Sequence, residues 1–172
     1  MENFNEQKSY RPIPAPRSGE RNAWMLAFLI FVIWFFMRMS GQKVPGSVTI
    51  FLILFVVVAL LISLSNWTER QTVLQLDQQG ILFKNGLRKV SLKWDEIESV
   101  KVIPAVWGKR VRVFGQGKQF DFHTLGEVKY RGMVRAHTGF AEGEEIIRLI
   151  VLRSQLSIAE GLDNTISYIR QH

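Results

Sequence analysis

The sequence predicts an α+β protein in which a hairpin of two transmembrane helices precedes an antiparallel β-module with a C-terminal helix. Three observations support this. Apolar residues crowd between Ala23 and Trp67, most of the remaining charge follows Thr68, and short runs alternate apolar and polar residues after that point. The predicted domains are an N-terminal tail at residues 1–21, a helical hairpin at 22–68 and a soluble module at 69–172.

The composition of the 172 residues limits the chemistry that the chain can perform. There is no cysteine, which excludes disulfides, thiolate nucleophiles, zinc–cysteine sites and iron–sulfur clusters. The net charge of +7, from 22 Lys and Arg against 15 Asp and Glu, suits anionic partners such as lipid headgroups. No cofactor and no metal site is predicted.

The tail contains the segment "RPIPAPR" at residues 11–17. Its prolines are spaced by two, so it lacks the P-x-x-P pattern of SH3-type ligands. We expect residues 1–21 to form a stiff, disordered cytoplasmic arm whose arginines contact headgroups or a partner protein.

The first hydrophobic segment is uncharged between Arg21 and Arg38. A helix from Ala23 to Met39 would span about 25 Å, slightly less than a hydrocarbon core of roughly 30 Å, so the flanking arginines would have to snorkel. A signal peptide is the alternative, but no small-x-small cleavage pattern follows Met37. Its phenylalanines can face lipid, a pigment or a neighbouring helix, and lipid is favoured.

The second hydrophobic segment is uncharged from Val44 to Thr68 and rich in Leu, Ile, Phe and Val. Trp24 and Trp67 lie where two helix ends would share one membrane interface. Neither segment carries Asp, Glu, Lys or His in its centre, which argues against an ion path, a proton relay or a haem ligand.

Basic residues outnumber acidic ones both in the tail and just after the second segment, whereas the link between the segments holds only Arg38 and Lys43. By the positive-inside rule, both termini are cytoplasmic. The predicted location is therefore the inner (plasma) membrane, with two crossings.

From Gln71 onward the chain reads as short strands. "TVLQLD", "ILFK" and "LRKVSLKW" form a meander, with Asn85-Gly86 as a hairpin turn whose residues tolerate φ > 0. Alternation then places one set of apolar side chains inward on the following strands. This set is Val90, Leu92, Trp94, Val100, Val102, Val111, Val113, Phe120 and Phe122.

The last part of the module is less regular. "EVKYRGMVRA" can form a further strand, whereas residues 126–144 as a whole fit no recognised pattern. Residues 144–152 are compatible with a strand or with a helix. In "SIAEGLDNTISYIRQH", Leu162, Ile166 and Ile169 recur at four and three residues, which predicts an amphipathic C-terminal helix.

The segment "LDQQGILFKNGLRKVSLKWDEIESV", residues 76–100, resembles the opening of bacterial pleckstrin-homology-like domains. In that family, a strand ending in Asp-x-x-Gly-Ile leads through a hairpin to Trp-x-x-Ile, and a pair of transmembrane helices often precedes the domain. The resemblance implies a barrel or sandwich of about seven antiparallel strands closed by a C-terminal helix. It assigns Trp94 and Ile97 as core anchors and leaves Asp95 and Glu96 exposed on a corner.

Other motifs give no site of chemistry. "GQGK" at residues 115–118 lacks the spacing of a phosphate loop and reads as a hairpin turn. His123 and His137 have no metal-ligand spacing, and nothing beside the acids at 95–98 indicates a cleft for carboxylate catalysis. No catalytic residue is predicted.

Basic residues in or beside predicted hairpins are the candidate contacts to an anionic surface, since each contributes on the order of 1 kcal/mol near such a surface. The alternative is that they are ordinary solvated side chains. No aromatic stacking platform accompanies them, which argues against nucleic acid. The candidates are Arg70, Lys84, Arg88, Lys89, Lys109, Arg110 and Arg112.

The sequence therefore predicts a non-enzymatic membrane protein whose module binds a protein partner or the anionic membrane surface, as a scaffold. The alternative is an accessory or assembly subunit of a larger bacterial membrane complex, with the aromatic first segment as its docking surface. Membrane lipids and a protein are the expected partners, with no nucleic acid and no small-molecule substrate.

Overall fold

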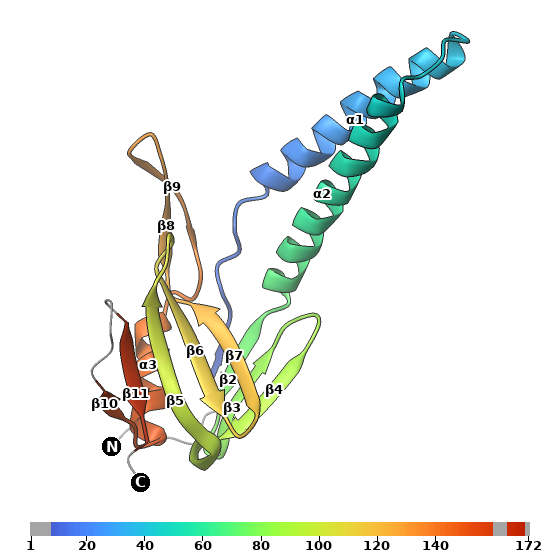
Figure 1. Ribbon diagram of the computed structural model, residues 1–172. Helices are drawn as coiled ribbons and strands as arrows, with labels where there is room; N and C mark the ends of the chain where they lie inside the picture. Colours follow the sequence, from blue (N-terminus) through green and yellow to red (C-terminus); the bar gives the residue numbers. More distant parts are fainter. Residues whose placement is uncertain (1–7, 160–164, 171–172) are drawn as a thin grey trace. The chain divides into compact units, whose positions relative to one another are not determined.

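The structure, a computed structural model, describes residues 8–159 and 165–170. The chain divides into two compact units, residues 16–68 and residues 1–15 with 69–172. The first unit is helical and the second carries the sheets (Figure 1). The predicted α+β class, with two long apolar helices ahead of antiparallel sheets, is confirmed. We call the second unit the module.

The helical unit consists of α1 (Ser18–Met39) and α2 (Gly46–Arg70), both long and apolar enough to cross a membrane. Ala27 and Ala59 are its buried residues, as expected where small side chains let two helices approach closely. The predicted start of the first helix, Ala23, was wrong. α1 begins five residues earlier, and its 22 residues extend about 33 Å. The added turn includes Glu20 and Arg21, so the uncharged stretch keeps its predicted length.

Polar side chains join the two helices near one end of the unit. The indole Nε1 of Trp24 donates to Ser63 Oγ at 2.9 Å, and Ser63 in turn donates to Glu20 Oε1 at 2.9 Å. Asn66 Nδ2 donates to the other oxygen of Glu20 at 2.9 Å. These bonds fix the pairing of the helices where apolar packing alone would allow them to slide.

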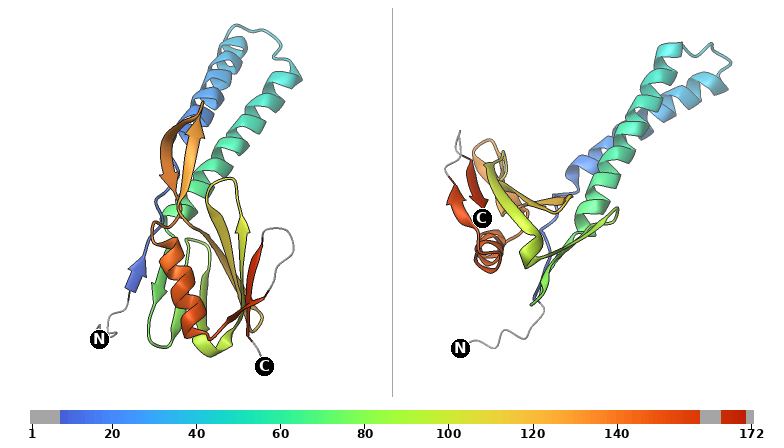
Figure 2. Two further views of the ribbon diagram at one scale, coloured as in Figure 1. Left: turned by 90° about the vertical axis from the view of Figure 1, so that its left-hand side faces the viewer. Right: turned by 60° about the horizontal axis from the view of Figure 1, so that its bottom comes forward.

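The strands of the module form antiparallel sheets that are not closed into a barrel (Figures 1 and 2). The first sheet has the order β1-β2-β3-β4 and the second the order β10-β11-β5-β6-β7, while β8 and β9 form a separate hairpin. The strands are β1 (Lys8–Tyr10), β2 (Val73–Leu76), β3 (Gly80–Lys84), β4 (Lys89–Lys93), β5 (Ile97–Pro104), β6 (Lys109–Gly115), β7 (Lys118–His123), β8 (Gly126–Tyr130), β9 (Met133–Thr138), β10 (Ser157–Ala159) and β11 (Ile166–Ile169).

The core lies between the two larger sheets and is completed by helix α3 (Gly143–Arg153). Phe83 of β3 stacks on Phe120 of β7 with ring centroids 5.0 Å apart. The alternation in β5, β6 and β7 is confirmed, because the predicted inward residues of these strands are all buried. From α3, Ile146, Ile147 and Ile150 enter the same core.

The β3–β4 hairpin is present where Asn85-Gly86 predicts it, but the turn works differently. Neither residue has a positive φ. Instead, the side-chain oxygen Oδ1 of Asn85 accepts the backbone N–H groups of Leu87 at 3.1 Å and Arg88 at 2.9 Å. The asparagine therefore closes the turn through its side chain.

The predicted helix over residues 157–172 was wrong. Residues 157–159 and 166–169 are the strands β10 and β11, and β11 pairs with β5. The helix of this region is α3, which covers the whole of residues 144–152, the stretch that was compatible with a strand or a helix. Pairing with β5 outweighs the local spacing, because a strand there covers an otherwise open sheet edge. Leu162 and Asp163 lie outside the described residues.

Part of the predicted disordered tail is ordered. Lys8–Tyr10 form β1, which pairs with β2, and Tyr10 is buried in the core. Residues 18–21 belong to α1. Within residues 126–144, which fit no recognised pattern, one further strand was predicted over 127–136. Residues 126–138 instead form a hairpin of two strands, β8 and β9, which extends beyond the ends of β5, β6 and β7 (Figures 1 and 2).

Candidate functional site

At one end of the module lie the residues that connect it to α1 and to α2. Ile13 forms an isolated bridge with Gly139, the residue after β9, with N···O distances of 2.8 and 3.1 Å. The carboxylate of Glu69 accepts the backbone N–H of Ala15 at 3.3 Å. The hydroxyl of Thr138 lies 3.3 Å from the other Glu69 oxygen. We call this the connection end.

Three predicted basic residues lie in the β3–β4 hairpin at this end. Lys84 and Lys89 are directly opposite each other in the sheet, and both are exposed. Arg88 stands in the turn between them, with its guanidinium 5.9 Å from the centre of the Phe83 ring. Val73, three residues after Arg70, pairs with Lys84. The hairpin turn therefore lies beside the point where the chain enters the module after α2.

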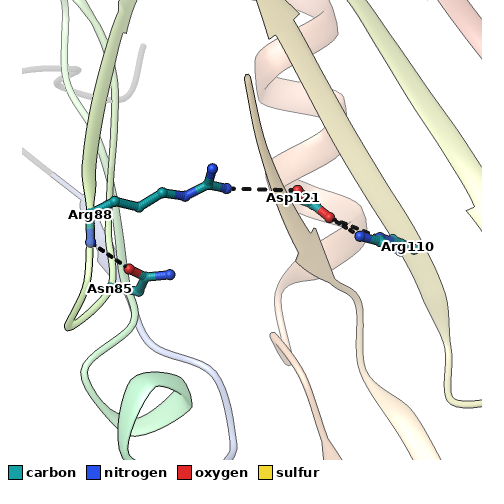
Figure 3. A network of polar contacts seen from close by, with 4 residues as sticks. All are labelled: Asn85, Arg88, Arg110 and Asp121. Carbon is teal, nitrogen blue, oxygen red and sulfur yellow. Dashed lines mark hydrogen bonds and ion pairs between the residues drawn. The ribbon is translucent and has the colours of Figure 1, made fainter. Parts of the chain in front are cut away.

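Arg88 and Arg110 converge on one carboxylate, that of Asp121 on β7 (Figure 3). Arg110 donates from Nε to Asp121 Oδ2 at 2.9 Å and also from its terminal NH2 group. Arg88 approaches the other carboxylate oxygen at 3.8 Å. Asp121 thus connects the two larger sheets and leaves this pair of arginines with a net positive charge.

The remaining predicted cations are spread over neighbouring positions. Lys109 at the start of β6 forms an ion pair with Glu144 of α3 at 2.7 Å. Arg112 lies opposite Lys101 on one side and Asp121 on the other, so the three share one face of the sheet. Within residues 8–159 and 165–170, no ion pair involves Arg112. Arg70 lies in the last turn of α2.

The structure therefore brings Arg88 of the β3–β4 hairpin and Arg110 of β6 to one carboxylate, that of Asp121. Arg112 lies opposite that residue, and Lys84 and Lys89 belong to the same hairpin as Arg88. Lys109 is paired with Glu144, and Arg70 lies in the last turn of α2. His123 lies opposite Arg110 in the ladder. Partial burial, followed by the positive charge of Arg110, lowers the pKa of His123. The imidazole is thus neutral at physiological pH and adds nothing to the positive charge of the surface.

The two proposed core anchors occupy different environments. Ile97 is fully buried in the core. Trp94 begins a short 3₁₀ turn and is only partly buried; its indole donates to the backbone oxygen of Asp77 at 3.2 Å, and Arg153 lies 5.3 Å above its ring. Asp95 is exposed, and the carboxylate of Glu96 accepts the backbone N–H of Lys93 at 3.0 Å.

Sequence reasoning missed a set of exposed apolar residues in turns at the connection end. Val106 is 93% exposed and Trp107 47% exposed in the β5–β6 turn. Tyr130 and Met133, both 58% exposed, flank the tip of the β8–β9 hairpin. A usable signal was present, since a Val-Trp pair between Pro104 and Gly108 is unusual in a turn.

A shallow depression of about 510 Å³ lies between α3 and β11. Its lining is mixed, with Glu144 and Arg148 beside Ile147, Val151, Leu152 and Tyr168. In the part of the chain that the structure describes, no three His, Asp or Glu side chains lie close enough to hold a metal ion.

A comparison of the chain with protein-family models, curated proteins and solved structures finds no match.

Proposed function

We propose that the chain is a non-enzymatic scaffold or accessory protein with two membrane crossings, whose pleckstrin-homology-like module binds the anionic membrane surface. The observation that carries this proposal is the group of cations around Asp121. Arg88, Arg110 and Arg112 lie beside a single carboxylate, and the opposed Lys84 and Lys89 add further charge. Such a surface attracts anionic headgroups at on the order of 1 kcal/mol per basic residue.

The pairing of β1 with β2 supports the proposed topology. β1 precedes α1 and β2 follows α2, yet the two strands hydrogen-bond in one sheet. Residues before and after the helices must therefore lie on the same side of any membrane that both helices cross. Together with the positive-inside bias, this favours two crossings of the inner (plasma) membrane with both termini cytoplasmic.

The second candidate function is an accessory or assembly subunit of a larger membrane complex. The specific observation in its favour is the aromatic face of α1. Phe31 stacks with Trp34 at 6.3 Å and with Phe35 at 6.1 Å, and the two phenylalanines are 44% and 45% exposed. Such a face suits another transmembrane helix as well as it suits lipid.

Lysine reactivity in nanodiscs tests the lipid proposal. The full chain is placed in phosphatidylcholine nanodiscs, with or without phosphatidylglycerol, and treated with an amine-reactive reagent. We expect the anionic lipid to slow modification of Lys84 and Lys89, and high salt to restore it, since the Debye length falls from about 8 Å at 0.15 M to about 3 Å at 1 M. Lys93 and Lys118, near the opposite turns, serve as internal controls.

Equal modification of Lys84 in neutral and anionic nanodiscs would contradict the lipid proposal. Native mass spectrometry in mild detergent then tests the second candidate function. A partner that co-purifies in fixed stoichiometry supports a subunit of a complex, whereas a free chain argues against one.

A further inference from the structure

We propose that the connection end of the module inserts the exposed apolar tips of its turns into the headgroup region of the bilayer. The tips are the β8–β9 turn (residues 130–133), the β5–β6 turn (105–108) and the β3–β4 turn (85–88). This inference rests on the proposed function, but it concerns apolar contact by residues that the charge-based proposal does not use.

The hydrogen-bond register of the module places all three turns at this end. Val73, which follows α2 directly, pairs with Lys84 beside the β3–β4 turn. The carbonyl oxygen of Lys109, the first residue after the β5–β6 turn, accepts the backbone N–H of Thr124 at 2.9 Å. The backbone of Trp107 passes so close to Gly126, at the base of β8, that a side chain there would collide with it. The base of β9 is bonded to Ile13.

The turns at the two ends of the module differ in chemistry. At the connection end each turn carries exposed apolar side chains, including Leu87 at 69%, Val106 at 93% and Met133 at 58%. At the opposite end the turns contain Gln78 and Gln79, Asp95 and Glu96, and Gln116 and Gly117. Among these turns, exposed apolar side chains therefore lie at the end where the chain continues into α1 and α2. Other exposed apolar side chains of the module, such as Leu152 and Ile158, lie on α3 and β10.

The residues of the β8–β9 hairpin are those that favour a membrane interface. Tyr130 at its tip and Trp107 beside its base are amphipathic rings of the kind enriched at headgroup depth. Lys129, Arg131 and Arg135 provide positive charge around the apolar tip. The single acid of the hairpin, Glu127, is paired with Lys129 at 3.0 Å.

The hairpin has the reach and the stiffness that insertion needs. Its strands of five and six residues span roughly 17 to 20 Å at about 3.4 Å per residue, and the hairpin extends past the other strands of the module (Figures 1 and 2). Arg131 and Gly132 form its tip with φ of 51° and 79°, a tight two-residue turn. The tip therefore presents Tyr130 and Met133 in a defined geometry.

The connectivity of the chain favours lipid as the partner that contacts these apolar tips. Only two residues separate α2, which ends at Arg70, from β2, which begins at Val73, so a bilayer crossed by α2 adjoins the module in every copy of the protein. A protein on the same tips would have to compete with that surface.

Spin-label accessibility tests this inference in the full chain. Because the chain has no cysteine, Met133→Cys and Val106→Cys each give one labelling site. Gln116→Cys at the opposite turn is the matched control, and Leu152→Cys labels an exposed apolar position far from the connection end. The labelled proteins are placed in nanodiscs of phosphatidylcholine and phosphatidylglycerol. Collisions of the label with oxygen and with a water-soluble nickel chelate are then measured.

We expect oxygen collisions to exceed nickel collisions at positions 133 and 106, with nickel collisions several-fold lower than at 116 and 152. Nickel collisions at 133 equal to those at 116 would overturn the inference. Low collision rates with both reagents at 133 would also overturn it, because they indicate burial against protein. Unchanged thermal unfolding of each labelled variant shows that the fold is retained.

Different experimental outcomes would contradict the charge-based proposal and the insertion proposal. If lipid charge leaves the lysine reactivity unchanged while the label at 133 lies in lipid, the charge-based proposal is wrong and insertion stands. If lysines are protected while the label at 133 remains in water, the module binds by charge alone.

Discussion

Asp121 controls the charge of the candidate surface, because its carboxylate is shared by Arg88 and Arg110. We predict that Asp121→Asn frees both guanidinium groups, so that anionic lipid protects Lys84 and Lys89 up to higher salt than in the parent chain. The free energy of unfolding should fall by about 1 kcal/mol, since the two arginines remain largely in contact with solvent although Asp121 is partly buried. Lysine footprinting over a salt series measures the first effect and thermal unfolding the second. If protection of the two lysines were lost at a lower salt concentration in the variant than in the parent chain, the assigned role of Asp121 would be wrong.

Trp94 is only partly buried, and a hydrogen bond to the backbone of Asp77 and the guanidinium of Arg153 above its ring hold the side chain in place. We predict that Trp94→Ala lowers the free energy of unfolding by about 2 to 3 kcal/mol, below the roughly 3 to 5 kcal/mol of a fully buried tryptophan. Trp107→Ala is the control, since this exposed ring should cost less than about 1 kcal/mol. Equal losses in the two variants, measured by thermal unfolding, would be inconsistent with the packing described.

Residue positions were predictable where a single period governs a strand. Alternation alone located Val100, Val111 and Phe120 in the core. The mechanism of the turn at Asn85 was not predictable, because an asparagine can close a hairpin by a positive φ or by its side chain, and both leave the same sequence signal. The convergence of Arg88 and Arg110 on Asp121 depends on how two sheets pack, which no local pattern encodes.

Among the elements, β1 is joined to α3 as well as to β2, because the carboxylate of Glu145 accepts from the hydroxyl of Tyr10 at 3.2 Å. The shorter bond to this carboxylate comes from the side chain of Lys8, which donates to Glu145 at 2.6 Å. This hydrogen bond is the main cause of the lowered pKa of Glu145 and of the raised pKa of Lys8. The stabilisation by Glu145 is present above its ordinary pKa of about 4.5 and is lost as pH falls through the lowered value. That by Lys8 is present below 10.5 and is lost as pH rises through the raised value.

We therefore predict that β1 is held most firmly between these limits. Hydrogen exchange at the amides of β1, corrected for its intrinsic pH dependence, should show greater opening in acid. Glu145→Gln should show that opening already at neutral pH, with little further change in acid. An identical acid response in the variant would show that another group controls β1.

The base of the β8–β9 hairpin depends on Gly139, which has a φ of 95° and lies against the carbonyl oxygen of Thr124. We predict that Gly139→Ala costs more than the roughly 1 to 2 kcal/mol of the left-handed conformation alone, because a Cβ atom would also collide with that oxygen. Gly117→Ala is the matched control, with a φ of 70° and open space around it. Thermal unfolding should rank the parent chain first, Gly117→Ala second and Gly139→Ala last.

The secondary structure of the C-terminal region could not be predicted from local sequence, because it depends on pairing between strands that are distant in the sequence. In α3 the apolar residues cover much of the surface, so its pattern fits a strand and a helix alike. In β11 the apolar spacing resembles a helix, but the strand is fixed by its ladder to β5, some sixty residues earlier in the sequence. Neither outcome follows from a window of local sequence.

For the whole molecule, the N-terminal strand belongs to the module although the helical unit separates it from the rest in sequence. We predict that deleting residues 1–10 exposes the edge of β2 and lowers the free energy of unfolding by at least the 1.5 to 3 kcal/mol or so of one large buried side chain, that of Tyr10. For a module of about 100 residues, that corresponds to a fall in melting temperature of several degrees or more.

Tyr10→Ala in the full chain separates the contribution of the side chain from that of the strand. We expect it to produce part of the loss seen on deletion. A truncated chain that melts at the temperature of the parent would mean that β1 contributes nothing to the stability of the module.

The pairing of β1 with β2 also has a consequence for biosynthesis. The ribosome makes Lys8–Tyr10 before the two helices, but their partners Leu74–Leu76 follow only after both helices have been translated. β1 must therefore stay unpaired until both helices have been made. The module thus cannot complete its first sheet before α1 and α2 have been made, and a nascent chain that stalls within α2 leaves β1 open to chaperones and proteases.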